Sequence, residues 1–375
     1  MNRIKITAVI LTVFAFLIGC QKNVAGPDDD TKGYLLSKVV VDGETSPKII
    51  TAGSAGVIMA KYQFYAGNED MKITKLKFTG SPAQNYDAVW LLDDANIYKV
   101  YLDGTGIAKF TDLQIAVPKD SWKTIVVKAD LKSISGGAVS GGTQFFVRMN
   151  AGASVSDVDL EAVSASGVWI KGSSVVKNDL DGPNMKLYKS IPEVGSLLAG
   201  FDPQLGNLGP NTPIYRFVML PDAKGAVSIK KLTFNVVASG VVVSTAATDW
   251  SLWNVTGTPY LVSQASDIVP PSSPSGGVVV INLAASREIE IPALGDGKFE
   301  LRTFVSGSLT GASISTYIVN DVTANSASAA SGSVTGDFVW SDQSDPAGHR
   351  TSSADYNNGF AIKYLPTAPL GRHGL

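Results

Sequence analysis

The fold is decided by the stretch Met71-Lys-Ile-Thr-Lys-Leu-Lys-Phe78, which returns later in the chain as Val227-Ser-Ile-Lys-Lys-Leu-Thr-Phe234. Apolar and polar residues alternate through much of both copies, which is the pattern of a β-strand with one buried face. In the first copy the alternation breaks between Ile73 and Leu76, which indicates a β-bulge or a local twist. The sequence therefore predicts an irregular strand that occurs twice.

Other segments repeat in the same order around this strand. Tyr62-Gln-Phe64 corresponds to Tyr215-Arg-Phe217, and Ile115-Ala-Val-Pro118 corresponds to Ile289-Glu-Ile-Pro292. The offset between the copies grows along the chain, which indicates insertions in loops, one of them around residues 270–277. Two tandem copies of one domain explain this order better than chance does.

Short apolar runs rich in β-branched and aromatic residues continue in both directions, separated by Gly, Pro, Asn, Asp and Ser. No stretch has the apolar i, i+3, i+4, i+7 spacing of an amphipathic helix. This pattern predicts an all-β protein of two tandem immunoglobulin-like antiparallel β-sandwiches. We expect the first domain at 34–190, the second at 191–366, and a C-terminal tail at 367–375.

The N-terminus is organised like a bacterial lipoprotein signal. A basic segment at 1–5 precedes the apolar run 6–18, which is too short to span a hydrocarbon core of ~30 Å. The following Leu17-Ile-Gly-Cys20 resembles a lipobox, and this resemblance implies cleavage before Cys20 and acylation of its thiol. An ordinary secretory signal with a chance cysteine is the alternative.

These features predict a signal peptide at 1–19, then a lipidated cysteine and a flexible polar tether at 20–33. Two or three acyl chains give stable anchoring where one chain is marginal. We therefore expect an exported protein whose partner is the membrane itself. It would be held on the cell surface, at the outer face of the plasma membrane or at the outer membrane.

Composition excludes several classes of function. The chain has 31 Lys and Arg against 33 Asp and Glu, a formal net charge of −2, so it lacks the basic surface that nucleic acid requires. Only two histidines, His349 and His373, and one cysteine occur, which leaves little material for a metalloenzyme, a thiol enzyme or a Ser-His-Asp site. Paired carboxylates for glycoside hydrolysis have no supporting motif. We expect no catalytic residues.

Two binding hypotheses are drawn from individual residues. Asp179, Asp181 and Asn184 place alternating oxygen ligands near the expected domain boundary, where they could bind Ca²⁺, although ordinary turn chemistry also explains them. Trp122, at an expected turn between Ser121 and Lys123, could stack on a sugar ring, and burial in the core is the alternative for any tryptophan. Apart from Ca²⁺ we expect no cofactor.

Three segments carry a resemblance to a known group. The first, 61–78, feeds an Asn/Glu/Asp turn into a lysine-rich strand, and the second, 115–131, ends in a Lys-Ala-Asp step. The third joins 338–344 with 355–360 and Leu365-Pro366. The chain thereby resembles the tandem β-sandwich, surface-layer-like extracellular proteins of Candidate Phyla Radiation (Patescibacteria) bacteria. The resemblance implies a fold and a surface location, and no catalytic signature.

Together these features predict a non-catalytic, lipid-anchored cell-surface protein with a structural or adhesive role. Its further partners would be surface glycans or other surface proteins. A carbohydrate-binding module, or a subunit of a surface layer or an extracellular fibre, is the alternative.

Overall fold

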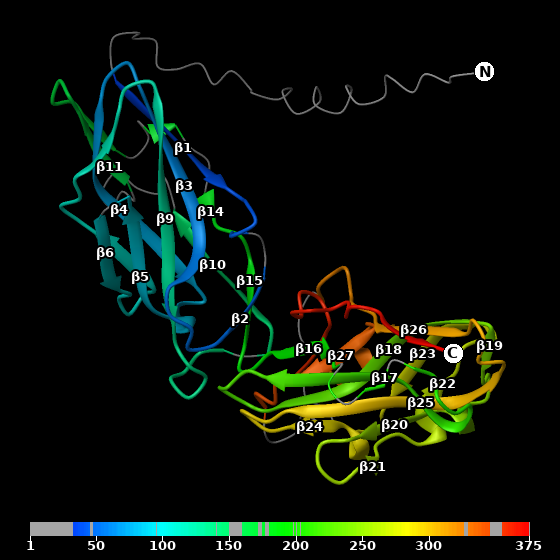
Figure 1. Cartoon of the computed structure of the whole chain (residues 1–375). Helices are drawn as coiled ribbons and strands as arrows, with labels where there is room; N and C mark the ends of the chain where they lie inside the picture. The colour runs from blue at the N-terminus through cyan, green and yellow to red at the C-terminus, as the bar shows by residue number, and fades with distance from the viewer. Residues whose placement is uncertain are drawn as a thin grey trace, which may run out of the picture.

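The computed structural model describes residues 33–374 except 46–47, 95, 140, 150–159, 172–174, 177–179, 198, 200, 203, 326–328 and 346–354. Within these ranges the chain is built from β-strands, and helical structure is limited to short 3₁₀ turns. Two lobes follow one another along the chain, each made of two mainly antiparallel sheets (Figure 1). The predicted all-β architecture of tandem sandwiches is confirmed.

The first lobe packs a six-stranded sheet against a nine-stranded sheet. The six-stranded sheet has the order β13-β1-β3-β9-β5-β6, and the nine-stranded sheet follows β12-β11-β4-β10-β15-β2 with β7, β8 and β14 at its sides. The strands of the six-stranded sheet are β1 (Tyr34–Val40), β3 (Val57–Gly67), β5 (Tyr86–Asp93), β6 (Asn96–Tyr101), β9 (Ser121–Leu131) and β13 (Val175–Val176). Those of the nine-stranded sheet are β2 (Ile49–Thr51), β4 (Met71–Ser81), β7 (Ile107–Phe110), β8 (Ile115–Val117), β10 (Thr143–Met149), β11 (Leu160–Ser164), β12 (Trp169–Lys171), β14 (Leu180–Asp181) and β15 (Met185–Tyr188).

The second lobe repeats this plan. One sheet has the order β16-β17-β25-β20-β21 with β19 beside β25, and the other runs β22-β23-β18-β26-β29 with β24, β27 and β28 at its sides. The strands of the first are β16 (Pro192–Ser196), β17 (Gly209–Pro221), β19 (Val241–Val243), β20 (Ser251–Asn254), β21 (Tyr260–Leu261) and β25 (Gly297–Gly307). Those of the second are β18 (Val227–Ser239), β22 (Ile268–Val269), β23 (Gly276–Asn282), β24 (Ile289–Ile291), β26 (Ser313–Ile318), β27 (Phe338–Ser341), β28 (Tyr356–Asn358) and β29 (Leu370–His373).

The strands β4 and β18, which contain the repeated stretch, occupy equivalent positions. Pairing of β4 with β11 skips Thr74, and pairing of β18 with β27 skips Lys230 at the corresponding place. The carbonyl oxygen of each skipped residue accepts a backbone N–H at 2.9 Å, from Leu113 in the first lobe and from Leu283 in the second. The predicted irregularity is therefore a β-bulge, and it is present in both lobes.

Each lobe encloses its own hydrophobic core, and the repeated aromatic residues form its centre. The ring of Tyr62 lies 5.2 Å from that of Phe78, and the ring of Tyr215 lies 6.2 Å from that of Phe234. All four side chains are buried. Burial of a side chain of this size stabilises a fold by roughly 1.5–3 kcal/mol relative to exposure, so the periodic apolar residues account for both sandwiches.

The segment expected to be a C-terminal tail is part of the second lobe, and that expectation was wrong. Residues Leu370–His373 form β29, which pairs with β26 and extends the sheet by one strand. The buried Thr367 hydroxyl accepts the backbone N–H of Ile318 at 2.8 Å and the hydroxyl of Tyr215 at 2.6 Å. An open edge at β26 would leave backbone groups without partners, and β29 supplies them.

Candidate functional site

The first lobe has one end next to the second lobe and one end remote from it, and the described chain begins at the remote end (Figure 1). Tyr34, the first residue of β1, pairs with Gly67, the last residue of β3. At the other end of β3, the nearby Ser54 hydroxyl accepts a hydrogen bond from Lys224 of the second lobe at 3.2 Å. The 11 residues of β3 span roughly 35 Å at ~3.3 Å per residue, and this length separates the start of the chain from the second lobe (Figure 1).

The described chain ends at the far end of the second lobe. Strand β18 begins next to Gly225, which contacts Ser190 at the lobe boundary, and it runs away from the first lobe to Ser239. Ser239 pairs with Ser313, and Ser313 pairs with His373. The two ends of the described chain therefore lie at opposite poles of a two-lobed molecule (Figure 1).

A dense set of contacts joins the lobes. The ring of Tyr188, at the end of β15, lies 4.9 Å from that of Trp340 and is part of the core of the second lobe. Its hydroxyl donates to Oδ1 of Asn357 at 3.0 Å. Nearby, Thr51 donates to Asp222 at 3.2 Å. We call the region in which these contacts join the two lobes the junction.

The junction contains two buried carboxyl groups, Asp342 and Asp355. The hydroxyl of Ser344 lies 2.6 Å from Oδ1 of Asp342 and 2.7 Å from Oδ1 of Asp355. The backbone N–H of Lys189, between the lobes, donates to Oδ2 of Asp342 at 2.6 Å. Burial, reinforced by the neighbouring carboxyl of Asp355, raises the pKa of Asp342 to about 7.

The residues predicted to bind Ca²⁺ are only partly described. Asp181, on β14, forms an ion pair with Arg148, whose Nη2 lies 2.8 Å from Oδ2, and these bonds lower the pKa of Asp181. Asn184 is exposed, and Asp179 lies outside the described residues. Within the described ranges, no group of three or more His, Cys, Asp and Glu side chains is arranged to bind a metal ion.

The predicted lipid anchor and one of the histidines cannot be placed. Cys20 and His349 lie outside the described residues. His373 is exposed on β29. Among the helices of the described residues, none is long and apolar enough to cross a membrane.

Trp122 lies on β9, on the outer face of the six-stranded sheet, rather than at a turn. Its side chain is 44% exposed, and that of Trp169 is 56% exposed. The ring of Trp122 lies 5.3 Å from that of Tyr65, which in turn lies 6.3 Å from the ring of Tyr34. Nζ of Lys38 lies over Trp122, 4.0 Å from the ring centroid. Since a cation covers the ring, a sugar would have to displace Lys38 to stack there.

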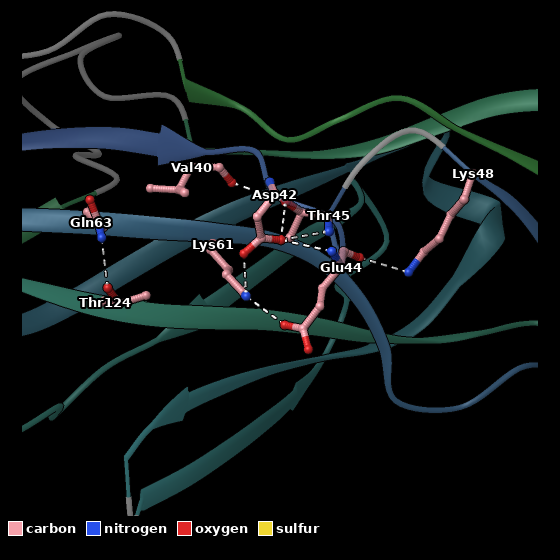
Figure 2. Close-up of polar contacts among 8 residues, drawn as sticks. All are labelled: Val40, Asp42, Glu44, Thr45, Lys48, Lys61, Gln63 and Thr124. Carbon is pink, nitrogen blue, oxygen red and sulfur yellow. Dashed lines mark hydrogen bonds and ion pairs between the residues drawn. The ribbon is translucent and has the colours of Figure 1, made fainter. Parts of the chain in front are cut away.

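Charged groups further along the same face are paired with one another. Nζ of Lys61 lies 2.5 Å from Asp42 and 2.6 Å from Glu44 (Figure 2). Oδ1 of Asp42 accepts the backbone N–H groups of Glu44 and Thr45 at 3.0 and 3.1 Å, which fixes the turn after β1. The bond from Lys61 is the largest cause that lowers the pKa of Asp42 to about 2. This cluster holds a loop on the sheet.

The second lobe has a polar cavity of about 680 Å³ next to β18 and β28. One of its two acidic side chains, Asp321, accepts backbone N–H groups from Asp337 at 2.8 Å, Phe338 at 3.2 Å and Gly359 at 2.7 Å. Nζ of Lys231 donates to the carbonyl oxygen of Gly336 at 2.5 Å. These charged groups hold the surrounding loops together.

A second cavity, of about 250 Å³, opens on the sheet formed by β17, β25, β20 and β21, and Trp253 and Phe304 line it. No motif in the sequence marks this place. Successive side chains of a strand point to opposite faces, so Leu252 and Trp253 in the strand Ser251-Leu-Trp-Asn254 must lie on different sides of the sheet. Leu252 is fully buried, and Trp253 therefore faces outward.

No protein-family model matches the chain, and no curated protein matches it. The type II cohesin dyad from the adaptor ScaA scaffoldin of Acetivibrio cellulolyticus is similar at 10% identity, covering 76% of this chain and 93% of that one, with a TM-score of 0.23. The C-terminal domain of the Streptococcus agalactiae AgI/II polypeptide BspA is similar at 7% identity, covering 76% and 95%, with a TM-score of 0.22. Similarity at this level carries no information on function.

Proposed function

We propose that this protein is an exported lipoprotein, anchored to the cell surface through Cys20, in which two β-sandwiches form a stalk with a structural or adhesive role. The observation that supports the proposal is the polarity of the molecule. The described chain begins at the pole of the first lobe opposite the second lobe, because Tyr34 pairs with Gly67. A membrane anchor that precedes this pole leaves the second lobe directed outward.

The length of chain before the first lobe limits its distance from the membrane. Thirteen Cα–Cα steps separate Cys20 from Gly33, which span at most roughly 45 Å at ~3.5 Å per residue. The first lobe then stays near the membrane, and the second lobe is the part that can reach a partner.

A non-catalytic role is supported by the way buried charges are used. Glu300 is buried and accepts hydrogen bonds from both Arg216 and Arg302 on the outer face of its sheet. Asp267, also buried, binds Arg287 through both carboxylate oxygens at 2.9 and 2.6 Å. Carboxylates engaged in this way hold the fold together.

Replacement of the anchoring cysteine tests the proposal. The full chain and its Cys20→Ser variant are expressed in a bacterium that processes lipoproteins, fractionated, and measured by intact mass. We expect the wild-type protein in the membrane fraction, released only by detergent, with a mass that shows cleavage before Cys20 and added acyl chains. The variant should lack both the acyl mass and the cleavage before position 20, so its mass should include residues 1–19.

Lys22→Ala is the matched control, because it changes the neighbouring sequence and leaves the lipobox intact. It should behave like the wild type. Protease added to intact cells should remove the second lobe from the wild type. A wild-type protein with a free Cys20 thiol, or one that is fully protected in intact cells, would contradict the proposal.

A further inference from the structure

The cavity of about 250 Å³ on the second lobe has the composition of a small-molecule site. Apolar and polar groups line it in similar measure. The apolar side chains include Pro210, Trp250, Trp253, Leu261 and Phe304, and the polar ones include Asn211, Thr248, Asp249 and Gln264. Ligand sites in proteins combine aromatic walls with a few polar groups in this way.

The Trp253 ring is held in position before any ligand arrives. Its Nε1 donates to the hydroxyl of Ser251 at 3.0 Å, and the guanidinium of Arg302 lies 4.7 Å from its ring centroid. Arg302 in turn donates twice to Oε2 of Glu300, at 2.8 and 2.5 Å. A side chain fixed in this way loses little conformational freedom when a ligand binds.

Two further apolar side chains at the cavity are left in contact with solvent. Phe304 is 37% exposed and Leu261 is 50% exposed. Phe304 follows Arg302 on the outward-facing side of β25, so it lies on the same face of the sheet as the Arg302–Trp253 pair. An aromatic ring held at the solvent edge of a cavity is available to cover an apolar surface.

The charge of the lining restricts the ligand. Among the described residues that line the cavity, none is Lys or Arg, and the adjacent Arg302 is paired with the carboxylate of Glu300, so the lining favours a neutral ligand over an anionic one. The one carboxylate, Asp249, accepts the Ser244 hydroxyl at 2.6 Å and can still accept from a ligand hydroxyl. The small volume excludes a helix or a folded partner.

We propose that this cavity binds one neutral pyranose ring of a glycan, with the apolar face of the sugar on Phe304 and on the face of Trp253 opposite Arg302, and its hydroxyls toward Asn211, Thr248 and Asp249. A pyranose has the required combination of an apolar C–H face and a polar rim. The site lies on the half of the lobe that faces away from the junction, since Phe304 is near the end of β25 that pairs with β19. It does not depend on lipid anchoring.

The test measures binding of four methyl pyranosides, those of β-glucose, β-galactose, α-mannose and N-acetyl-β-glucosamine, to the detergent-extracted full chain by saturation-transfer NMR. We expect at least one to bind. Trp253→Ala and Phe304→Ala should each weaken binding at least roughly tenfold. Asn211→Gly removes the amide at a residue whose φ is 57°, a value that glycine adopts freely, so it should weaken binding with the fold intact.

Trp122→Ala is the matched control, because it removes an exposed tryptophan from the other lobe and should leave binding unchanged. Thermal unfolding of each variant shows that the fold persists. Absence of binding to all four sugars, loss of binding in Trp122→Ala, or equal binding by the wild type and all three cavity variants would overturn the proposal. Each of these results leaves the anchoring experiment unaffected.

Discussion

At the scale of single residues, the buried carboxyl group of Asp342 links the junction to pH. Its pKa is raised from 3.8 to about 7, first by burial and then by the charge of Asp355. Between these two pH values the folded protein keeps a proton that the unfolded chain has lost. The contribution of Asp342 to stability is therefore complete at low pH and is lost as the pH rises toward 7.

We expect Asp342→Asn to flatten this dependence. The free energy of unfolding of the wild type should fall between pH 4.5 and 7.5, by up to roughly 1.4 kcal/mol per pH unit in the range where Asp342 titrates. In the variant this component of the slope should be absent, because an amide does not titrate. Urea unfolding at several pH values measures the slope.

Asp355→Asn should reduce the slope in part, because burial of Asp342 remains. Asp112→Asn is the control: this residue is exposed, and its φ of 57° is one that asparagine tolerates. It removes the same formal charge and should retain the wild-type slope. Parallel pH profiles for the wild type and Asp342→Asn would show that the carboxyl pair is not linked to folding.

The aromatic residues show where the sequence is informative about binding and where it is not. Trp122 is exposed, as stacking on a sugar requires, but it lies on an open sheet face beneath Lys38. The cavity next to Trp253 brings together residues as distant in sequence as Pro210 and Phe304. Concavity depends on such distant segments, so local alternation can indicate an outward tryptophan but not the hollow beside it.

At the scale of elements, the bulge in β4 and β18 fixes strand register. Thr74 and Lys230 differ in side chain but occupy the same backbone position, so the bulge follows from the apolar residues on either side. Ile73 and Leu76 are three positions apart, so a regular strand would place them on opposite faces. Both are buried because Thr74 is an extra residue that shifts the alternation by one position. This is why the irregularity could be predicted from the sequence.

Deletion of Thr74 is expected to be far more damaging than its substitution. Without the extra residue, one half of β4 must turn its apolar side chains to solvent, or lose its pairing with β11. We expect the variant to lose the cooperative unfolding transition of the first lobe, measured by calorimetry. Thr74→Ala removes only the hydroxyl bond to the carbonyl of Glu161 at 3.2 Å and should cost about 1 kcal/mol. Equal stability of the two variants would contradict this account.

Other elements could not be predicted, because their partners are far away in sequence. Strand β29 is short and contains glycine, and only the unpaired edge of β26 makes it a strand. The contact between Lys189 and Asp342 joins residues 153 positions apart. Periodicity shows which residues face a core, but not which sheet edge or loop will meet a given segment.

At the scale of the whole molecule, the junction should hold the two lobes in one arrangement. Since Cys20 is the only cysteine, the Cys20→Ser chain can carry spin labels at two introduced cysteines alone. Lys119 and Thr310 are exposed positions at the two poles. We expect double electron–electron resonance between labels at Lys119→Cys and Thr310→Cys to give one narrow distance distribution.

Addition of Asp342→Ala should broaden that distribution, because the Lys189 N–H loses its acceptor at the junction. Asp267→Ala removes a buried carboxylate whose bonds to Gln264, Ala284 and Arg287 all lie within the second lobe, and it should leave the width unchanged. A broad distribution in the parent chain would mean that the lobes move independently.

The pairing of Tyr34 with Gly67 also determines how the molecule carries mechanical load. A ligand held by the second lobe and an anchor before Tyr34 would pull β1 along its own axis. The ladder between β1 and β3 runs over all seven residues of β1, with its hydrogen bonds perpendicular to that pull. The pull then loads all the hydrogen bonds between β1 and β3 in shear, so they must break together and not one after another. We therefore expect the first lobe to withstand a higher force than it would if β1 were pulled off the sheet from one end.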